Sequence, residues 1–319
     1  MALIPPADLQ SFADHLSKST RILALLGAGL SAASGLPTFR GAGGMWRAFD
    51  ATSLATPEAF EEDSGLVWQF YSYRRHMAVN AKPNRAHYAL AELAKKNENF
   101  ITLSQNVDGL SPRAGHPSEQ LHLLHGSLFD IRCTSFYCNY SRKDDFTDPI
   151  VPALAIPTEG AHPDPSTTDK TGEEATKALY DAMQAQPQRG RELDIADPNV
   201  PIPKLTADEL PKCPQCSGLL RPGVIWFGEA LPQATIQTVN SWIRDSPKID
   251  LILVIGTSSQ VYPAAGYVHT AREKGARVAV IDMDQNNVLK KSLTPNDWFF
   301  QGDAGEIVPK LLESVIGEI

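Results

Sequence analysis

Four cysteines are the residues whose type and spacing point most directly to chemistry. Cys133 and Cys138 form a C-x4-C pair, Cys213 and Cys216 form a C-x2-C pair, and 74 residues lie between the pairs. Two close pairs, each able to lie on a turn, can present four thiolates to zinc in a tetrahedron. The spacing therefore favours a structural zinc site, because four cysteine ligands leave no open position for a catalytic water.

Two other interpretations of the cysteines stay open at this point. The four thiols could be unrelated and buried, or they could form two disulfides. Disulfides are disfavoured because the opening segment MALIPPADLQ lacks the basic region of a secretory signal, and disulfides are rare in proteins that stay inside the cell.

A glycine-rich segment follows the apolar run at residues 21–26 (RILALL). Gly27-x-Gly29-x-x-Ala32 satisfies the dinucleotide-binding fingerprint in its G/A form. Small residues let the backbone approach a pyrophosphate, and the amides of the following helix face it. The pattern also fits a strand–helix turn that binds no ligand.

The residues after this turn argue against a hydride-transferring enzyme. Such an enzyme should continue with a helix and a strand that ends in Asp or Glu about 20 residues on. The chain continues instead as LPTFRGAGGMW, which is too rich in glycine for a regular helix, and Asp50 lies on no predicted strand. We therefore expect a loop over a bound dinucleotide.

Short apolar runs alternate with helical patterns along much of the chain. The predicted strands are residues 21–26, 101–103, 251–255, 277–281 and 298–300. The predicted helices are residues 12–18, 86–96, 235–244, 264–274 and 304–316. This alternation predicts an α/β fold with a Rossmann-like parallel sheet, covered on both faces, that binds ligands at the carboxyl ends of its strands.

Residues 141–212 interrupt this rhythm. They contain 10 of the 24 prolines and no long apolar run. We interpret them as an insertion, mostly an extended loop with one helix near residues 173–184. Because the cysteine pairs bracket the insertion, a zinc ion would hold together a smaller domain inserted into the Rossmann-like one.

Composition narrows the class of protein further. The chain has 319 residues, 42% of them apolar and 21% charged, with a formal net charge of −8. An acidic globular chain is not expected to bind the nucleic-acid backbone, and no apolar run of about 18 residues predicts a membrane span. We expect an intracellular protein, cytoplasmic or nuclear by default, with the mitochondrion as an alternative.

Longer motifs resemble those of one known family. GAGLSAASGLPTFRG, SQNVDGL, LHG, the two cysteine pairs, VIWFGE, GTSSQVYPAAG and FFQGDAG occur in the order and spacing of the sirtuins. Sirtuins are NAD-dependent protein-lysine deacylases. The resemblance covers roughly residues 16–316 and implies one structural zinc ion, with NAD consumed as a co-substrate.

The resemblance also implies a set of NAD-binding residues. They are Gly27, Ala28, Gly29, Ser31, Thr38, Phe39, Arg40, Gln105, Asn106, Asp108, Gly256, Thr257, Ser258, Asp282 and Ala304. Phe39 matches the position that shields the nicotinamide ribose. Asp282 departs from the family pattern, because many relatives have Asn there, but an acid can still accept a hydrogen bond from a ribose hydroxyl.

His125, in LHG, matches the family's catalytic histidine, and Asn106 and Asp108 complete the implied catalytic set. A single histidine is more often structural, and the chain has eight, so this role rests on the resemblance. In the family the acyl-lysine oxygen attacks C1′ of the nicotinamide ribose, and the histidine activates a ribose hydroxyl as general base. The products are free lysine, nicotinamide and O-acyl-ADP-ribose.

Two further segments match those that contact the substrate. Val224, Trp226, Phe227, Gly228, Glu229 and Tyr262 match residues that flank the peptide backbone, which would add to the first segment as a strand. Tyr71-x-x-Arg74 resembles the signature of the desuccinylase-type sirtuins. Residues three apart on a helix share a face, and a guanidinium suits a carboxylate. The resemblance thus implies removal of succinyl, malonyl or glutaryl groups, although the tetrapeptide alone also fits an ordinary helix face.

These interpretations divide the chain into three parts. Residues 1–40, 85–130 and 220–319 form the predicted Rossmann-like domain, residues 41–84 the cofactor loop and acyl-lysine-binding helices, and residues 131–219 the zinc module. Expected partners are acyl-lysine proteins or peptides. The alternatives are a deacetylase without acidic-acyl preference, an enzyme that transfers ADP-ribose to protein, and a non-catalytic scaffold that binds NAD or acyl-lysine.

Overall fold

The computed structural model describes residues 4–38, 44–158 and 190–319. Phe39 and Arg40 lie outside the described residues, as does the helix predicted near residues 173–184. Of the helices in the described part of the chain, none combines the length and the apolar character that a bilayer-spanning segment requires.

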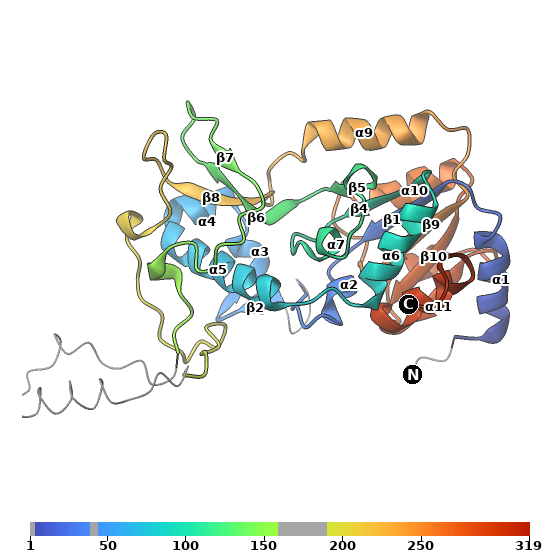
Figure 1. Cartoon of the computed structure of the whole chain (residues 1–319), viewed down its shortest axis with the longest axis horizontal. Helices are drawn as coiled ribbons and strands as arrows, with labels where there is room; N and C mark the ends of the chain where they lie inside the picture. Colours follow the sequence, from blue (N-terminus) through green and yellow to red (C-terminus); the bar gives the residue numbers. More distant parts are fainter. Residues whose placement is uncertain (1–3, 39–43, 159–189) are drawn as a thin grey trace, which may run out of the picture.

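A six-stranded parallel sheet forms the larger lobe, with strand order β11-β10-β9-β1-β4-β5 (Figure 1). The strands are β1 (Ile22–Leu26), β4 (Phe100–Ser104), β5 (Leu121–Leu123), β9 (Leu251–Ile255), β10 (Arg277–Asp282) and β11 (Trp298–Gln301). The chain runs outward from β1 through β4 to β5, and on the other side from β9 through β10 to β11. This is the doubly wound order of dinucleotide-binding domains, with its reversal between β1 and β9, where such sheets bind ligands.

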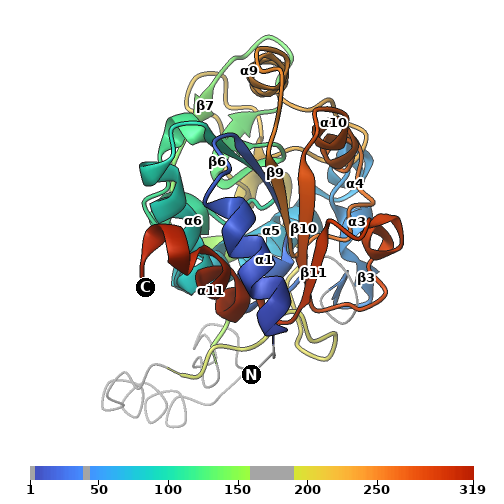
Figure 2. The same cartoon turned by 90° about the vertical axis from the view of Figure 1, so that its right-hand side faces the viewer.

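Helices cover both faces of the sheet, as predicted (Figure 2). Alternate residues of β1 enter different apolar clusters, with Ala24 and Leu26 on one face and Leu23 and Leu25 on the other. The first face packs against α1 (Pro6–Leu16), α6 (Arg85–Lys96) and α11 (Ala304–Ile316), and the second against α9 (Gln233–Arg244) and α10 (Gly266–Glu273). Burial on both sides explains why the strands are continuously apolar.

The five predicted strands and the five helices predicted outside the insertion are all present. The ends of β9 and α11 are as predicted, and those of the others are shifted. Helix α1 begins at Pro6, earlier than the predicted residue 12, because proline is well tolerated in a first helical turn. Strand β5 was not predicted, because its three residues (LHL) are only partly buried and His122 interrupts the apolar run. Asp50, expected on no strand, ends β3 (Phe49–Asp50), which pairs only with β2 (Met45–Trp46) outside the main sheet.

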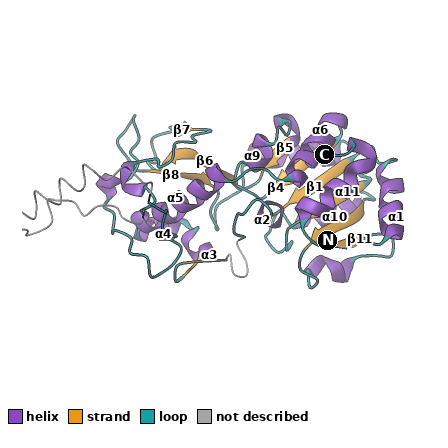
Figure 3. Cartoon of the chain, turned by 60° about the horizontal axis from the view of Figure 1, so that its bottom comes forward, coloured by secondary structure: helices purple, strands orange, loops and turns teal. Residues whose placement is uncertain are grey.

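A second lobe lies beside the sheet and combines helices with a small antiparallel sheet of order β7-β6-β8 (Figure 3). Its elements are α3 (Ala51–Leu54), α4 (Pro57–Glu62), α5 (Ser64–Asn80), β6 (Gly126–Cys133), β7 (Ser141–Arg142) and β8 (Leu220–Val224). Trp68 and Phe70 of α5 share one apolar cluster with Leu220 of β8 and with Cys213. The helical segment and the cysteine-containing module therefore have a common core.

Short elements complete the described fold. They are α2 (Gly29–Ala32), α7 (Leu110–Arg113) and the 3-10 helices Ser118–Gln120, Pro152–Leu154, Ala207–Glu209 and Val288–Ser292.

Helix α5 is anchored at both ends and along its buried side. The Asp63 carboxylate caps its first turn by accepting from the Leu66 amide at 2.9 Å. Arg113 donates to the Ala78 carbonyl at 2.7 Å near the last turn. The buried Arg75 guanidinium donates to three carbonyl oxygens, those of Leu128, Asp145 and Thr147. These bonds fix the rotation of α5 about its axis. They therefore determine which of its side chains face the six-stranded sheet.

The turns after β1 and β9 touch through their backbones. The Gly29 amide donates to the Gly256 carbonyl at 2.9 Å. Gly256 has a φ of +59°, and a Cβ there would lie 2.4 Å from the backbone nitrogen of Leu30. Only glycine satisfies both conditions, since it adopts positive φ without strain and carries no Cβ.

Gly256→Ala should therefore destabilise the protein more than an alanine at another glycine of positive φ. Gly275 is the matched control, because its φ is +88° but its Cβ would meet nothing closer than 3.8 Å. We expect a loss in the free energy of unfolding of about 1 kcal/mol for Gly275→Ala and about 3 kcal/mol or more for Gly256→Ala. Urea unfolding curves measure both, and equal losses would contradict the close-contact argument.

Candidate active site

A cavity of about 580 Å³ opens at the carboxyl ends of the central strands, and residues of α5 and of the segment after β8 line its other side. The predicted residues that line it are Gly27, Ala28, Gly29, Ser31, Thr38, Gln105, Asn106, Asp108, His125, Gly256, Thr257, Ser258, Asp282 and Ala304, together with Tyr71, Arg74, Val224, Trp226, Phe227, Gly228, Glu229 and Tyr262. The fold thus brings together every predicted cofactor, catalytic and substrate residue that lies in the described ranges.

His125 follows β5, and its ring is oriented by the backbone. Its Nδ1 lies 3.1 Å from the carbonyl oxygen of Gln105. Because a carbonyl can only accept, Nδ1 carries the proton and Nε2 keeps its lone pair. Burial lowers the pKa of His125 below 6.5, against the opposing effect of the bond to Gln105. The imidazole is therefore neutral at pH 7 and can accept a proton.

Hydrogen bonds to neighbouring turns hold the polar side chains that follow β4. Ser31 donates to the Asp108 carboxylate at 2.6 Å. Asn106 donates to the Gly27 carbonyl at 3.0 Å, and Gln105 donates to the Thr257 hydroxyl at 3.0 Å. These bonds join the turns after β1, β4 and β9 into one preorganised surface.

Tyr71 and Arg74 line the cavity from α5. The Tyr71 side chain is buried, and its hydroxyl has no hydrogen-bond partner among the described residues. Burial raises the pKa of Tyr71, although Arg74 opposes the shift, so the phenol is a neutral donor. Burial also lowers the pKa of Arg74, whose guanidinium still remains charged at pH 7. Among the described residues that line the cavity, Arg74 alone has a lysine or arginine side chain.

Glu229 and Arg221 fix the segment after β8. Arg221 donates to Glu229 Oε1 at 2.7 Å and to Oε2 at 2.9 Å, and the Trp226 amide donates to Oε2 at 2.7 Å. Burial alone would raise the pKa of Glu229, but the bonds from Arg221 and Trp226 outweigh it and lower that pKa. The Arg221 guanidinium also stacks on the Trp226 ring, 3.2 Å from its centroid. The cavity wall at Trp226 is therefore rigid.

Three contributing residues were not singled out from the sequence. Arg221 supports Trp226, as above. His87 lies behind Ser31, with its Nε2 3.5 Å from the Ser31 hydroxyl, and burial lowers its pKa to about 4. Asn287 joins the turn after β9 to the end of β10. Only His87 had a sequence signal, since Asn84-x-x-His87 has the spacing of a helix capping box.

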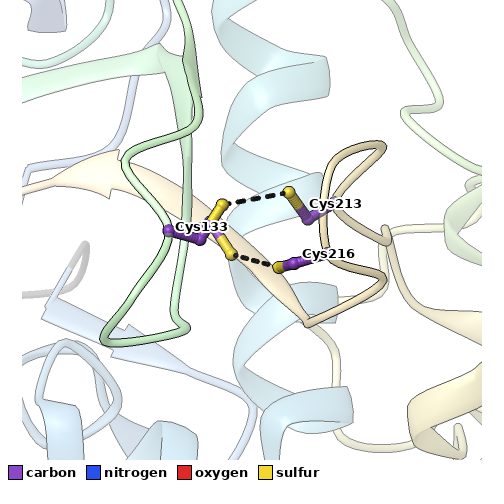
Figure 4. Close-up of side chains that lie close together, drawn as sticks. Cys133, Cys213 and Cys216 are labelled. Carbon is purple, nitrogen blue, oxygen red and sulfur yellow. Dashed lines mark hydrogen bonds between the residues drawn. The ribbon is translucent and has the colours of Figure 1, made fainter.

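The four cysteines gather where two loops meet, as Figure 4 shows for Cys133, Cys213 and Cys216. Cys133 and Cys216 have sulfurs 3.5 Å apart, Cys138 and Cys213 have sulfurs 3.7 Å apart, and all four sulfurs lie within 4.8 Å of one another. A tetrahedral zinc with bonds of about 2.3 Å needs sulfurs about 3.8 Å apart. The arrangement fits zinc, whereas a disulfide needs about 2.05 Å. The interpretations as unrelated thiols or as disulfides are therefore excluded.

The chain is similar to known proteins over most of its length. The Sir2 family model matches residues 27–263. The chain belongs to the Sir2 family. It is 45% identical to an NAD-dependent protein deacylase of Candida albicans, over 98% of this chain and 99% of the relative. It is 38% identical to the mitochondrial NAD-dependent protein deacylase sirtuin-5 of Danio rerio, over 97% of this chain and 88% of the relative.

Solved Sir2 structures share the fold over nearly the full length. A crystal structure of a Sir2 homologue in complex with NAD aligns with a TM-score of 0.69 at 32% identity, covering 98% of this chain and 94% of that one. A mutant Sir2 homologue in complex with 2′-O-acetyl-ADP-ribose aligns with a TM-score of 0.70 at 32% identity, covering 98% and 96%. The similarity thus extends through both lobes and not only through the Rossmann-like sheet.

The cysteine geometry generates a prediction about metal content. We expect one tightly held zinc per chain, and we expect Cys138→Ser combined with Cys213→Ser to lose the metal and to lower the thermal stability, because Cys213 belongs to the core of the second lobe. Elemental analysis and thermal unfolding with and without a chelator measure this. Ser135→Ala, in the loop between Cys133 and Cys138, is the control. A metal-free preparation that is as stable as the zinc-bound protein would contradict the site.

Proposed function

We propose that this protein is an NAD-dependent protein-lysine deacylase that removes acidic acyl groups, namely succinyl, malonyl or glutaryl, and yields nicotinamide and O-acyl-ADP-ribose. The observation that carries the proposal is that Tyr71 and Arg74 line the same cavity as His125 and Asn106. Membership of the Sir2 family and the names of the two relatives above support the deacylase part.

The proposal assigns the two halves of the cavity to the two substrates. NAD, when bound, supplies the ribose that accepts the acyl group. Its pyrophosphate would lie against the glycine turn after β1, with Asn106 and Asp108 toward the nicotinamide half and Thr257 and Asp282 toward the adenosine half. The sheet order supports this division, because β4 and β10 lie on opposite sides of β1, and the resemblance assigns the nicotinamide half to the β4 side. The Sir2 homologue solved with NAD supports this use of the cavity.

His125 would act as the general base. Its Nδ1–H bond to Gln105 leaves Nε2 to take a proton from a ribose hydroxyl. Because the ring is already neutral at pH 7, no proton has to leave before turnover. The Sir2 homologue solved with 2′-O-acetyl-ADP-ribose supports transfer of an acyl group to ribose in this family.

Tyr71 and Arg74 would recognise the distal carboxylate of the acyl group. The buried phenol offers a hydrogen bond that the described residues leave unused, and the guanidinium offers a paired donor set in a desolvated place. A charge-assisted hydrogen bond of this kind contributes about 1.5–3 kcal/mol. Ala55, which also lines the cavity, leaves space for an acyl chain longer than acetyl.

The zinc ion would act away from this chemistry. The four cysteines would hold it between the turn that joins β6 to β7 and the loop before β8, and its four sulfur ligands leave no position for a water. Its contribution is to the second lobe, whose core includes Cys213 and the buried side of α5.

Replacing the proposed carboxylate-binding pair should separate two activities. We expect Tyr71→Phe combined with Arg74→Met to reduce kcat/KM for a succinyl-lysine peptide by about a hundredfold, the loss of roughly two charge-assisted bonds. The same variant should retain or gain activity on the acetyl-lysine peptide. Nicotinamide release from NAD, measured with both peptides, gives the two rates.

Tyr73→Phe is the matched control, because Tyr73 neighbours the pair on α5 but does not line the cavity. It should leave both rates unchanged. Equal losses on both peptides in the double variant, with thermal stability retained, would refute acidic-acyl recognition and favour a plain deacetylase. Label transferred from NAD to protein would favour ADP-ribosyl transfer, and no nicotinamide release from any peptide would favour a scaffold.

The lowered pKa of His125 predicts the acid limb of the pH profile. A general base works only unprotonated, so kcat should fall as the pH drops through the pKa of His125 and should halve at a pH below 6.5. His125→Gln should abolish turnover yet still bind NAD. His122→Gln, on β5 just before His125 and outside the cavity lining, should keep the wild-type profile. A midpoint above pH 7 would exclude His125 as the titrating base.

A further inference from the structure

Two segments of the insertion lie against helix α5. The first spans residues 145–154 and the second residues 191–205, and neither lines the cavity. Ser72 donates to a carbonyl of the first segment at 3.0 Å, and Gln69 donates to a carbonyl of the second at 2.8 Å. These bonds join neutral groups, so a change of pH near neutrality leaves them intact.

His76, on the same helix, contacts both segments through charged groups. Its Nδ1 lies 2.7 Å from Asp148 Oδ2 in the first segment, and its Nε2 lies 3.0 Å from Glu192 Oε2 in the second. An imidazole ring donates from both nitrogens only when it is protonated. The two bonds to carboxylates therefore exist together only in the imidazolium form.

The two carboxylates differ in their exposure to water. The Asp148 side chain is 15% exposed, whereas the Glu192 side chain is 57% exposed. When the ring loses a proton, the remaining N–H stays on Nδ1, because Asp148 is the closer and less hydrated acceptor. Nε2 then presents its lone pair to Glu192, and a carboxylate has no hydrogen to donate to it.

Asn80 offers the neutral ring another partner at the same nitrogen. Its Nδ2 lies 3.3 Å from His76 Nε2 and also donates to the His76 carbonyl at 3.0 Å. An amide nitrogen donates and does not accept, so it bonds to Nε2 only when that ring nitrogen is unprotonated. Glu192 and Asn80 therefore favour opposite protonation states of His76.

The charges around the ring favour its protonated form. Burial alone would lower the pKa of His76, but the hydrogen bonds and charges of Asp148 and Glu192 outweigh it and raise that pKa above 6.5. Within three residues of these partners along the described chain, the other ionisable groups are Tyr73, Arg74 and Arg75 on α5, Asp145 in the first segment, and Arg191 and Asp194 in the second. Arg74 lines the cavity, and Arg75 donates to backbone carbonyls. Carboxylates therefore predominate around His76.

We propose that His76 is a pH-sensitive switch that attaches the second segment of the insertion, through Glu192, to α5, the helix that lines the cavity. The protonated ring holds Asp148 and Glu192 together. The neutral ring keeps Asp148, accepts a bond from Asn80 and releases Glu192. Because the pKa of His76 is raised in the folded protein, this attachment stabilises the fold fully below pH 6.5 and is lost as the pH rises through the raised pKa.

The titration of the His76 ring tests the switch. Histidine rings are labelled with carbon-13 in the full-length protein and followed by NMR as the pH is varied, and the His76 signal is the one missing from His76→Gln. The wild-type pKa should exceed 6.5. Glu192→Gln should lower the proton affinity of the ring by about threefold, the effect of one exposed ion pair. Asn80→Ala should raise it, because the neutral ring loses its donor.

His269 provides the matched control. Its Nε2 lies 3.2 Å from Glu273, and both side chains are exposed. The His269 titration should be the same in every variant above, and Glu273→Gln should leave His76 unchanged. A wild-type His76 pKa at or below 6.5 would overturn the proposal. So would an unshifted pKa in Glu192→Gln, or a shift in the same direction in Glu192→Gln and Asn80→Ala.

A second measurement follows the second segment itself. The Leu193 amide, next to Glu192, donates to the Pro157 carbonyl at 2.8 Å. Its protection against hydrogen exchange, corrected for the intrinsic rate, should fall by about twofold to fivefold in the wild type between about pH 6 and pH 8. His76→Gln should show no such fall. Equal wild-type protection at both pH values would refute release of Glu192. Neither measurement uses NAD or an acyl peptide, so the proposed function stands or fails separately.

Discussion

The direct backbone contact between the turns after β1 and β9 is the constraint on which the site depends. It brings the two turns at the sheet's point of reversal together with no side chain between them. Gln105 and Asn106 then bond to the same turns from β4. A bulkier residue at Gly256 would separate β1 from β9 and so move Gln105 and Asn106 relative to Asp282. The geometry of the cavity therefore depends on Gly256 having no side chain.

The opposite wall depends on a different interaction, the buried Arg75 with its three backbone carbonyls. A guanidinium has five donors in a fixed plane, so it can join α5 to two separate segments of the second lobe at once. Tyr71 and Arg74 project from the same helix, and their positions relative to His125 follow from that attachment. The buried Arg75 thus positions its neighbour in the sequence, Arg74, which lines the cavity.

The sequence alone predicted the Rossmann-like sheet, because five apolar runs with intervening helices have few other solutions. The family resemblance supplied the site residues: most follow a strand or lie in a long motif, whereas Tyr71 and Arg74 rest on a short helical signature. It could not predict β5, β6 and β8, because a run such as Leu220–Val224 (LRPGV) contains a proline and a glycine and has no alternation. The roles of Arg221 and Asn287 were not predicted for a related reason. Arg221 meets Glu229 only because the chain turns back after β8, and Asn287 meets Thr257 of another segment, so both roles exist only after folding.

The distribution of charge explains why the net value of −8 says little about the substrate. Burial lowers the pKa of Arg74, so its charge is costly to keep unless an anion lies beside it. In the proposed reaction a succinyl carboxylate would supply this anion, whereas an acetyl group would supply none. Selectivity of this kind comes from penalising the neutral substrate as much as from attracting the acidic one. One desolvated guanidinium can therefore outweigh a surface that repels acids overall.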